Sequence, residues 1–439
     1  MSNPAQADGS AYSVEPIMLP TGPRVDPYEM YEKMRDEKVV HLIREPNGLH
    51  RQLVLRFAEA RDIFTDDRFA KDPGLAWDQL RDAGYVKGER DNRADYVYHL
   101  VNTDPPDHTR LRKLIGKAFT ARRIEEIRPR VQEIADELLA ELARHEANDL
   151  VEDYAHPLAT RVICEILGVP DTDRENFRIW ATAMLTAPDA VPEGALTPQE
   201  GYAAMRAFFT ELIARKRAEV TGAGEPAATD SQPDVLTGLI AARDEGDRLT
   251  ETELISTAML LLSAGQEPTV NLIANGTLAL LRHPGQLKLL SDRPDLIASA
   301  VEEFLRFDPP VELSTMRVST ADVEVAGTVI PAGSVVTVSI ASTSRDDRQF
   351  ADPDRLDITR PDNPHLAFGF GLHHCLGAPL ARMEGQVGIG KLVARFPGLA
   401  LACAPEDLRW RPTRIMRGLV ELPVRLGGSA QPATDGPAG

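Results

Sequence analysis

The residues best suited to chemistry lie in one stretch, FGFGLHHCLGAPLAR, which begins at Phe368 and ends at Arg382. Cys375 stands there among glycines and histidines, and apolar residues at helical spacing begin just after it. A helix N-terminus stabilises a thiolate, and glycine lets backbone N–H groups approach the sulfur. Because Gly371 and Gly377 carry no side chains, the stretch predicts an anionic sulfur bound to something large and flat.

Three other interpretations of this stretch have specific weaknesses. A zinc site from His365, His373, His374 and Cys375 lacks the usual ligand spacing, and consecutive residues rarely converge on one tetrahedral metal. A cysteine nucleophile would need a histidine partner in space, whereas these histidines are sequence neighbours. The segment GQVGIGK, residues 385–391, matches the start of a phosphate-binding loop, but it lacks the following Ser or Thr and no strand precedes it.

The composition excludes some functions and favours a cytoplasmic protein. The formal net charge of −18 argues against a nucleic-acid binder, because such a protein needs a basic face. No run of ~18 uncharged apolar residues predicts a membrane span, and the first residues lack the features of a signal peptide. Cys164 and Cys403 lie in apolar segments and form no disulfide framework with Cys375, which indicates a reducing compartment.

The pattern Phe368-x-x-Gly371-x-His373-x-Cys375-x-Gly377 resembles the haem-binding signature of the cytochrome P450 family, in its soluble bacterial form. The resemblance extends over roughly residues 20 to 425. It implies a mainly α fold with a small β-rich region, and haem b (iron protoporphyrin IX) with Cys375 as the thiolate on its iron. It also implies a monooxygenase that inserts one atom of O2 into an organic substrate.

Glu303 and Arg306, in the segment VEEFLR, form a pair at positions i and i+3 of a predicted helix. Taken alone, this spacing is typical of a surface ion pair, because the two side chains share a helix face. The resemblance implies another role, since Glu-x-x-Arg begins a buried Glu–Arg–Arg triad in the family. We expect Arg355, in FADPDRLD, to complete the triad, and removing one member of a buried pair costs ~3–5 kcal/mol.

His108 and Arg112, in DPPDHTRLRKLIGKAF, lie four residues apart and share one face of a predicted helix. On their own they are typical of a solvated charged face. By resemblance they would bind the haem propionates together with Arg317 and His373. Carboxylates held by cations form strong, charge-assisted pairs.

The segment LLLSAGQEPTVNL resembles the family's oxygen-binding stretch, in which Ala264-Gly265-x-Glu267 is followed by threonine. Pro268 stands at the position of that threonine, which in the family helps deliver protons to dioxygen. Proline has no hydroxyl, removes the helical hydrogen bond to residue 264 and predicts a kink. We expect protons to arrive through water at the Ala264 carbonyl, through Glu267 or through the substrate, because Thr269 lies ~100° further round the helix.

The expected substrate is a sizeable apolar natural-product intermediate such as a polyketide macrolactone, hydroxylated or epoxidised. The segments expected to line the pocket are mostly aliphatic, and the pocket residues are Leu100, Val101, Leu261, Val311, Leu313, Ile415 and Met416. Because Pro268 replaces threonine, oxidative coupling or peroxide-driven chemistry is an alternative. A haem protein for electron transfer or gas sensing is the alternative from another functional class.

A basic segment from Arg110 to Arg130 stands out against the acidic total. It is either a solvated helix face or the docking surface of an acidic electron donor that is attracted by charge. By resemblance that donor is a ferredoxin, which receives electrons from NAD(P)H through a ferredoxin reductase.

These residues need a mainly helical scaffold to position them. Apolar residues at intervals of three and four predict helices over 124–142 and 203–220. A longer helix is predicted over 250–282, opened by a capping box of Thr250 and Glu253. Valine-rich sequence with Gly and Pro predicts short strands over 323–340, and one more strand over 419–426.

We expect one domain over residues 21–426, because a haem between His108 and Cys375 would need both sides of the polar loop 221–234. Residues 1–20 are expected to be a flexible N-terminus and 427–439 a disordered tail. The protein is expected to be a monomer that binds a small molecule and neither nucleic acid nor membrane.

Overall fold

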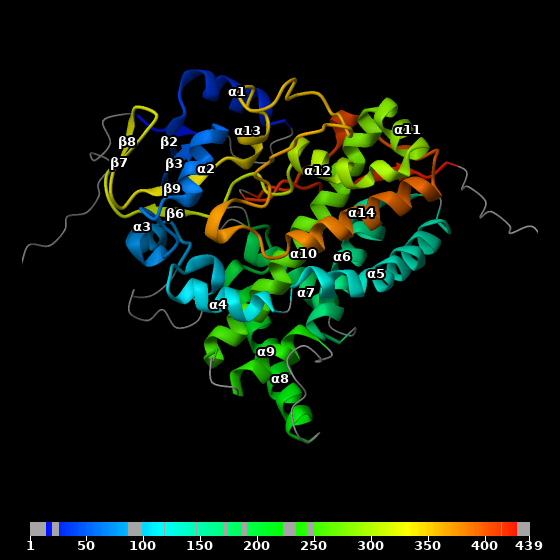
Figure 1. Cartoon of the computed structure of the whole chain (residues 1–439), viewed down its shortest axis with the longest axis horizontal. Coiled ribbons are helices and arrows are strands. Elements are labelled where there is room, and N and C mark those ends of the chain that lie inside the picture. Colours follow the sequence, from blue (N-terminus) through cyan, green and yellow to red (C-terminus); the bar gives the residue numbers. More distant parts are fainter. Residues whose placement is uncertain are drawn as a thin grey trace, which may run out of the picture.

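The structure of the chain is a computed structural model, shown in Figure 1. It describes residues 15–19, 26–86, 99–117, 119–145, 147–170, 174–186, 191–222, 234–244, 249–413 and 415–427. Most of the expected flexible N-terminus, the tail after residue 427 and most of the loop 221–234 lie outside the described residues. No helix in the described part of the chain is long and apolar enough to cross a membrane.

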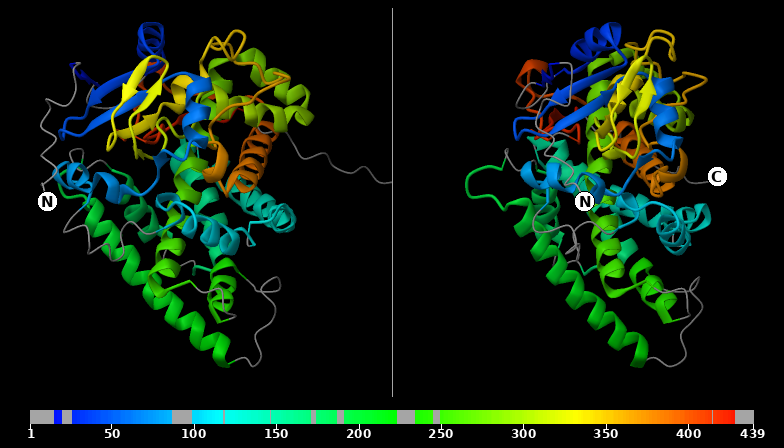
Figure 2. Two further views of the ribbon diagram at one scale, coloured as in Figure 1. Left: turned by 60° about the vertical axis from the view of Figure 1, so that its left-hand side comes forward. Right: turned by 90° about the vertical axis from the view of Figure 1, so that its left-hand side faces the viewer.

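Helices make up most of the molecule, as Figures 1 and 2 show. Their bounds are α1 Tyr28–Glu37, α2 Phe57–Thr65, α3 Trp77–Asp82, α4 Asp107–Gly116, α5 Ala121–Leu142, α6 His156–Leu167, α7 Arg174–Leu185, α8 Pro198–Gly222, α9 Val235–Asp244, α10 Glu251–Arg282, α11 Pro284–Asp292, α12 Ile297–Phe307, α13 Ile340–Ser344 and α14 Ala378–Arg395. The three helices predicted over 124–142, 203–220 and 250–282 are confirmed as α5, α8 and α10.

The strands that Figure 1 labels, β2, β3 and β6 to β9, lie together at its upper left. Their bounds are β1 Ile17–Met18, β2 Val40–Arg44, β3 His50–Val54, β4 Phe69–Ala70, β5 Asn148–Asp149, β6 Arg317–Ser319, β7 Val323–Val325, β8 Thr328–Ile330, β9 Val335–Val338, β10 Ala400–Leu401 and β11 Pro423–Arg425. The largest sheet has the order β1-β2-β3-β9-β6-β4, β10-β11-β5 form a second sheet, and β7-β8 are a hairpin.

The strands predicted over 323–340 and 419–426 are confirmed as β7, β8, β9 and β11. The pair β2–β3 was not predicted, because HRQLV reads as polar and shows no regular alternation. Its charged residue is buried all the same, since Arg51 Nε lies 2.6 Å from Glu45 Oε1 with both side chains almost inaccessible. An ion pair across the β2–β3 turn thus accompanies the burial of this strand, which also pairs with the distant strand β9.

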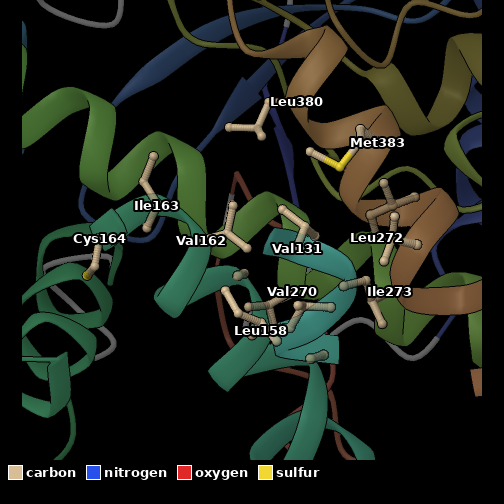
Figure 3. Packing of buried hydrophobic residues seen from close by; sticks show 14 of the residues in the cluster. Val131, Leu158, Val162, Ile163, Cys164, Val270, Leu272, Ile273, Leu380 and Met383 are labelled. Carbon is tan, nitrogen blue, oxygen red and sulfur yellow. The ribbon is translucent and has the colours of Figure 1, made fainter. Parts of the chain in front are cut away.

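Helix α10 runs through the centre of the molecule and contacts α6, α8, α12 and α14. The predicted capping box starts it: Thr250 Oγ1 accepts a hydrogen bond from Glu253 N, and Glu253 Oε2 accepts one from Thr250 N. The helices pack closely at Gly276, where an added Cβ would lie 2.9 Å from side chains of α12 and α14. Figure 3 shows Leu272 and Ile273 of α10 beside Met383 of α14 in this core. The segment after Cys375 is thus held directly against α10.

Candidate active site

The loop before α14 presents the sulfur of Cys375 at the N-terminus of that helix. A hydrogen bond of 2.9 Å from the Cys375 N–H to the Phe368 carbonyl oxygen closes the loop. Burial raises the pKa of the Cys375 thiol, whereas hydrogen bonds from the backbone of Gly377 and Ala378 lower it. The side chain is nevertheless exposed, so the sulfur is accessible although protein surrounds it on most sides. Because the net pKa is raised, a bound metal cation is needed to make it a thiolate at neutral pH.

The two glycines of this loop have different roles. Gly371 has φ +71°, and an added Cβ would lie 2.9 Å from the Phe64 carbonyl oxygen, so the protein itself requires glycine there. At Gly377 an added Cβ would lie 3.9 Å from the Cys375 sulfur, which is ordinary contact. The protein leaves room for a side chain at Gly377, so a ligand on the sulfur is the group that would need this space. Phe368 lies beneath the guanidinium of Arg382, 4.5 Å from ring centroid to Cζ.

Two histidines from distant parts of the chain meet beside the loop. His108 of α4 and His373 have ring centroids 4.1 Å apart. Burial lowers the pKa of His108 to about 4, and the charge of Arg112 adds to this. Burial also lowers the pKa of His373 to about 2, with further lowering by Lys71, Arg317 and other cations. The structure thus brings His108, Arg112, Arg317 and His373 together, as the sequence predicted.

Lys71 belongs to the same group of cations, although no sequence motif pointed to it. Its side chain is buried and its ammonium donates hydrogen bonds to Thr315 Oγ1 at 2.8 Å and to the Met316 carbonyl oxygen at 2.6 Å. Burial and then the charge of Arg317 lower the pKa of Lys71 well below its ordinary value, opposed by Asp104. A lysine ammonium close to other cations is electrostatically unfavourable unless an anion binds between them.

This cluster of cations fits the propionates of the haem that the sequence implies. Both ring nitrogens of His108 are buried and have no hydrogen-bond partner among the described residues. Buried polar atoms are normally paired, so these nitrogens indicate a polar ligand. Burial lowers the pKa of Arg317 to about 10, which shows how little water surrounds these cations. Carboxylates would supply both the missing negative charge and the missing acceptors.

Helix α10 passes this region with an opening in its buried surface. Ala264 is exposed, whereas Ser263 before it is buried. Pro268 lies within the helix and has no N–H to donate to the Ala264 carbonyl, which is left without its helical partner. Thr269 Oγ1 donates to the Gly265 carbonyl at 3.2 Å, so its hydroxyl is engaged within the helix. That Thr269 does not replace the missing threonine at 268 stays a prediction.

The carboxylate of Glu267 is held by an ion pair and is not free to turn toward the exposed Ala264. Its Oε1 accepts a hydrogen bond of 2.5 Å from Arg411 Nη1, and both side chains are largely buried. Arg411 belongs to the C-terminal segment, more than a hundred residues away, and its partner could not be inferred from spacing. Any role of Glu267 with protons therefore has to include this arginine.

The triad prediction is correct for two residues and wrong for the third. Arg306 donates to Glu303 Oε2 at 2.8 Å and to Oε1 at 2.7 Å, and neither side chain is accessible. The third cation is Arg360, whose Nε lies 3.2 Å from Glu303 Oε2. The Arg355 side chain is 66 % exposed and lies 3.8 Å from Asp357 Oδ2. Both arginines occur in an irregular segment, where spacing gives no indication of which side chain turns inward.

The predicted pocket residues divide into two groups. Val101, Leu261, Val311, Ile415 and Met416 are half-buried, as residues that face a ligand should be. Val311 forms a β-bridge with Met416, and Glu312 N donates to the Ile415 carbonyl at 2.7 Å. Leu313 is instead packed with the apolar residues under α1, and Leu100 belongs to the main core. Leu100 and Leu313 are therefore buried in the core clusters, and their contact with a substrate stays a prediction.

The competing interpretations of the cysteine loop find no support in the structure. His365 Nε2 lies 3.2 Å from Glu302 Oε2, so this histidine is engaged with a carboxylate and not with Cys375 in a zinc site. Among the described residues, no group of three or more His, Cys, Asp and Glu side chains could hold a metal ion. The glycines of segment 385–391 lie inside α14 and not in a loop. Cys164 is buried in the core of Figure 3.

Half of the basic segment is neutralised by ion pairs. Arg110 pairs with Glu253, Arg122 with Glu126, Arg128 with Glu125 and Arg130 with Glu165. Lys113 and Lys117 are exposed at the end of α4. That end touches the cysteine loop, since an added Cβ at Gly116 would lie 3.9 Å from Leu376. The positive charge that remains is therefore beside the loop and not spread over the whole segment.

Comparisons with known proteins point to one family. A sequence model described as "Cytochrome P450" matches residues 81–400. The chain is 43 % identical to the cytochrome P450 monooxygenase PikC of Streptomyces venezuelae, over 91 % of both chains. It is 39 % identical to the 6-deoxyerythronolide B hydroxylase of Saccharopolyspora erythraea, over 92 % of this chain and 97 % of that one. The tirandamycin C-bound structure of the P450 monooxygenase TamI superimposes with a TM-score of 0.83 at 40 % identity, covering 94 % and 100 % of the two chains.

Proposed function

The chain belongs to the cytochrome P450 family and is a monooxygenase, and we propose that it oxidises a sizeable apolar natural product such as a polyketide macrolactone. Similar proteins include a 6-deoxyerythronolide B hydroxylase and a mycinamicin IV hydroxylase/epoxidase. The half-buried aliphatic residues Val311, Ile415 and Met416 support the same substrate class, because they would offer apolar contact and few hydrogen bonds.

We propose that Cys375 binds the iron of haem b and that the cation cluster binds its propionates. The observation that carries this assignment is the pairing of an accessible sulfur at a helix N-terminus with buried, unpartnered His108 nitrogens beside it. His373, Arg112, Arg317 and Lys71 would share the charge of the propionates. When bound, haem supplies the chemistry that activates O2 for transfer of one oxygen atom to carbon.

The protein's own residues would orient and protect this chemistry. Gly377 leaves the space beside the sulfur free, and Phe368, which lies under Arg382, would shield the sulfur. The exposed Ala264 leaves space for dioxygen and substrate next to α10. Overall, R–H, O2, NAD(P)H and one proton give R–OH, water and NAD(P)⁺.

Proton supply in this chain differs from the family's threonine route. The Ala264 carbonyl, freed by Pro268, accepts hydrogen bonds and so can hold a water molecule. That water, a hydroxyl of the substrate or the carboxyl of Glu267 would then provide the protons. The same substitution supports a second candidate function, oxidative coupling or peroxide-driven chemistry, which needs no proton relay through a threonine.

Electrons would enter where the cysteine loop reaches the surface. Phe370 and Leu372 are 39 % and 43 % exposed, which is unusual for large apolar residues. Lys113 and Lys117 lie on the α4 end that touches the loop, and Arg61 lies over the Phe370 ring at 5.4 Å. An apolar centre with cations around it fits an acidic ferredoxin, reduced by a ferredoxin reductase.

We also propose that residues 21–426 act as one domain, because a haem held by both His108 and Cys375 joins the N-terminal and C-terminal halves. Such a protein would act as a monomer with its substrate and redox partners.

Substrate screening tests the proposed function most directly. Macrolactones, terpenoids and cyclic peptides would be titrated into the holoprotein, and the low-spin to high-spin shift of the haem band recorded. We expect macrolactones to give the tightest binding and, with ferredoxin, ferredoxin reductase and NAD(P)H, a product that is heavier by one oxygen atom. Dimeric or ring-closed products without added oxygen would favour the coupling reaction. Consumption of NAD(P)H that no ligand changes would contradict both.

A further inference from the structure

Three polar side chains lie along the face of α10 that meets the C-terminal segment. Glu267, Asn271 and Asn275 are spaced four residues apart and therefore share one helix face. All three are buried. Burying polar groups costs free energy unless they form hydrogen bonds, so the contacts of these three side chains show what they stabilise.

One partner is the C-terminal loop, by which we mean residues 410–413 and 415–419. Asn275 Nδ2 donates a hydrogen bond of 2.9 Å to the Arg417 carbonyl oxygen. Asn271 lies against Gly418, where an added Cβ would lie 2.0 Å from Asn271 Oδ1, so only glycine fits. Together with the pair Glu267–Arg411, these contacts fix the loop along about two turns of α10.

The C-terminal loop also holds itself together. Arg411 N donates to the Gly418 carbonyl at 2.9 Å, and Arg411 Nε donates to the Leu419 carbonyl at 3.1 Å. Thr413 Oγ1 donates to the Met416 carbonyl at 2.7 Å. Arg411 at the base and Met416 at the tip therefore belong to one loop that is closed by hydrogen bonds.

Burial of the ion pair Glu267–Arg411 costs desolvation free energy, so we expect a role of this pair beyond stability. Two charges that leave water cost several kcal/mol, and apolar residues of similar size often stabilise a protein as well or better. The Arg411 side chain is 14 % exposed and that of Glu267 5 %. The pair also lies directly before Pro268, the position at which this chain has lost the hydroxyl that handles protons in its family.

We propose that Arg411 is a positioning residue, which holds the Glu267 carboxylate beside Pro268 and links its position to the loop that carries Ile415 and Met416. A substrate that presses on Ile415 and Met416 would then change how Glu267 is held, so that proton supply follows substrate fit. This inference rests on the proposed oxygen chemistry but not on the substrate class.

The test compares four variants with a matched control. The variants are Arg411→Gln, Arg411→Lys, Glu267→Gln and the double variant Glu267→Gln/Arg411→Gln. The control is Arg409→Gln, because Arg409 lies two residues away, is 66 % exposed and pairs with Glu421 at 2.7 Å. Each holoprotein is given a plant-type ferredoxin, its reductase, NADPH and O2, with and without myristic acid as the probe ligand. NADPH consumed and hydrogen peroxide formed are measured together, since NADPH, H⁺ and O2 give NADP⁺ and H2O2 when oxygen transfer fails.

We expect Arg411→Gln to raise the fraction of NADPH recovered as peroxide several-fold. Arg411→Lys keeps the positive charge and should bring this fraction most of the way back to the wild-type value. The double variant should match Glu267→Gln alone, because the arginine acts through that carboxylate. An unchanged fraction in Arg411→Gln, an equal change in Arg409→Gln, or additive effects in the double variant would overturn the proposal.

Stability measurements keep the test decisive if turnover cannot be measured. A double-mutant cycle on the unfolding free energy of wild type, Glu267→Gln, Arg411→Gln and Glu267→Gln/Arg411→Gln gives the coupling between Glu267 and Arg411. We expect a favourable coupling, and a value of zero would overturn the proposal. A wild-type holoprotein that consumes no NADPH with any ligand would contradict the proposed function instead, and the coupling would still decide the inference. If Arg411→Gln does not fold, the cycle is built with Arg411→Lys and Glu267→Gln/Arg411→Lys in its place.

Discussion

The buried carboxylate of Glu303 allows a sharp prediction, because the structure ranks three arginines around it. Arg306 makes two hydrogen bonds to it, Arg360 makes one, and the Arg355 side chain makes none. Asn363 Nδ2 and Asp357 N donate the remaining hydrogen bonds to the carboxylate, at 3.0 and 2.9 Å. Replacement of each arginine by methionine removes the charge and keeps most of the apolar side chain.

The magnitudes follow from how much of the pairing each change removes. Arg306→Met takes away the main counterion of a carboxylate with no access to water, and we expect a loss of about 3–5 kcal/mol. Arg360→Met removes one charge-assisted hydrogen bond to Glu303 and three exposed ones to backbone carbonyls, and it leaves Arg306 in place. We expect a loss of about 1.5–3 kcal/mol, mainly from the bond to the buried carboxylate. Arg355→Met changes an exposed side chain, and we expect an effect within about 0.5 kcal/mol.

Urea unfolding of the three holoproteins measures these differences, with the haem band and far-UV circular dichroism followed together. The expected order of destabilisation is Arg306→Met, then Arg360→Met, then Arg355→Met close to wild type. If Arg355→Met loses as much stability as Arg360→Met, the assignment of Arg360 to the triad is incorrect. Haem content at equal protein concentration should follow the same order.

Three further predictions concern electron entry, protons and the core. Lys113→Glu/Lys117→Glu should slow reduction of the protein by ferredoxin at low salt, and the difference should vanish at high salt. The control Lys288→Glu reverses an exposed charge on α11 and should leave the reduction rate unchanged. Equal stopped-flow rates for Lys113→Glu/Lys117→Glu and the control would refute the docking site. Pro268→Thr restores a hydroxyl, so it should lower the hydrogen peroxide formed per NADPH consumed more for poorly fitting ligands than for well-fitting ones. Equal peroxide per NADPH in wild type and Pro268→Thr with every ligand would show that Pro268 is only a kink. Glu384 is fully buried and has no hydrogen-bond partner among the described residues, and burial raises the pKa of its carboxyl well above 4.5. Wild type should therefore lose stability as the pH rises above 4.5, and Glu384→Gln should gain on it by about 1.4 kcal/mol per pH unit. A constant difference in unfolding free energy between about pH 5 and pH 7 would argue against a neutral acid there.

Much of the site could be predicted because its signals are local. The cysteine loop needs glycine at position 371 for a positive φ next to Phe64, and an anionic sulfur needs the helix that begins at Ala378. The long helix α10 is visible in its capping box and its apolar sequence. Short-range rules govern these features, so the sequence shows them without knowledge of the fold.

The residues that were missed or misplaced depend on distant contacts. Arg360 and Arg355 lie in the same irregular segment, and only the path of the backbone decides which guanidinium reaches Glu303. Lys71 joins the histidines of the cation cluster from a different part of the chain, outside any motif. Arg411 meets Glu267 across the packing of the C-terminal loop on α10. None of these pairings has a characteristic spacing, because each is fixed by tertiary structure.

The ligand of the haem iron is the central claim, and one spectroscopic measurement tests it. The holoprotein, Cys375→Ala and the control Cys403→Ser are reduced, exposed to carbon monoxide and recorded as difference spectra. Wild type and Cys403→Ser should show the absorption band typical of thiolate-bound haem, and Cys375→Ala should lack it because its loop has no sulfur to offer. Survival of that band in Cys375→Ala would show that another residue binds the iron and that this site has been assigned wrongly.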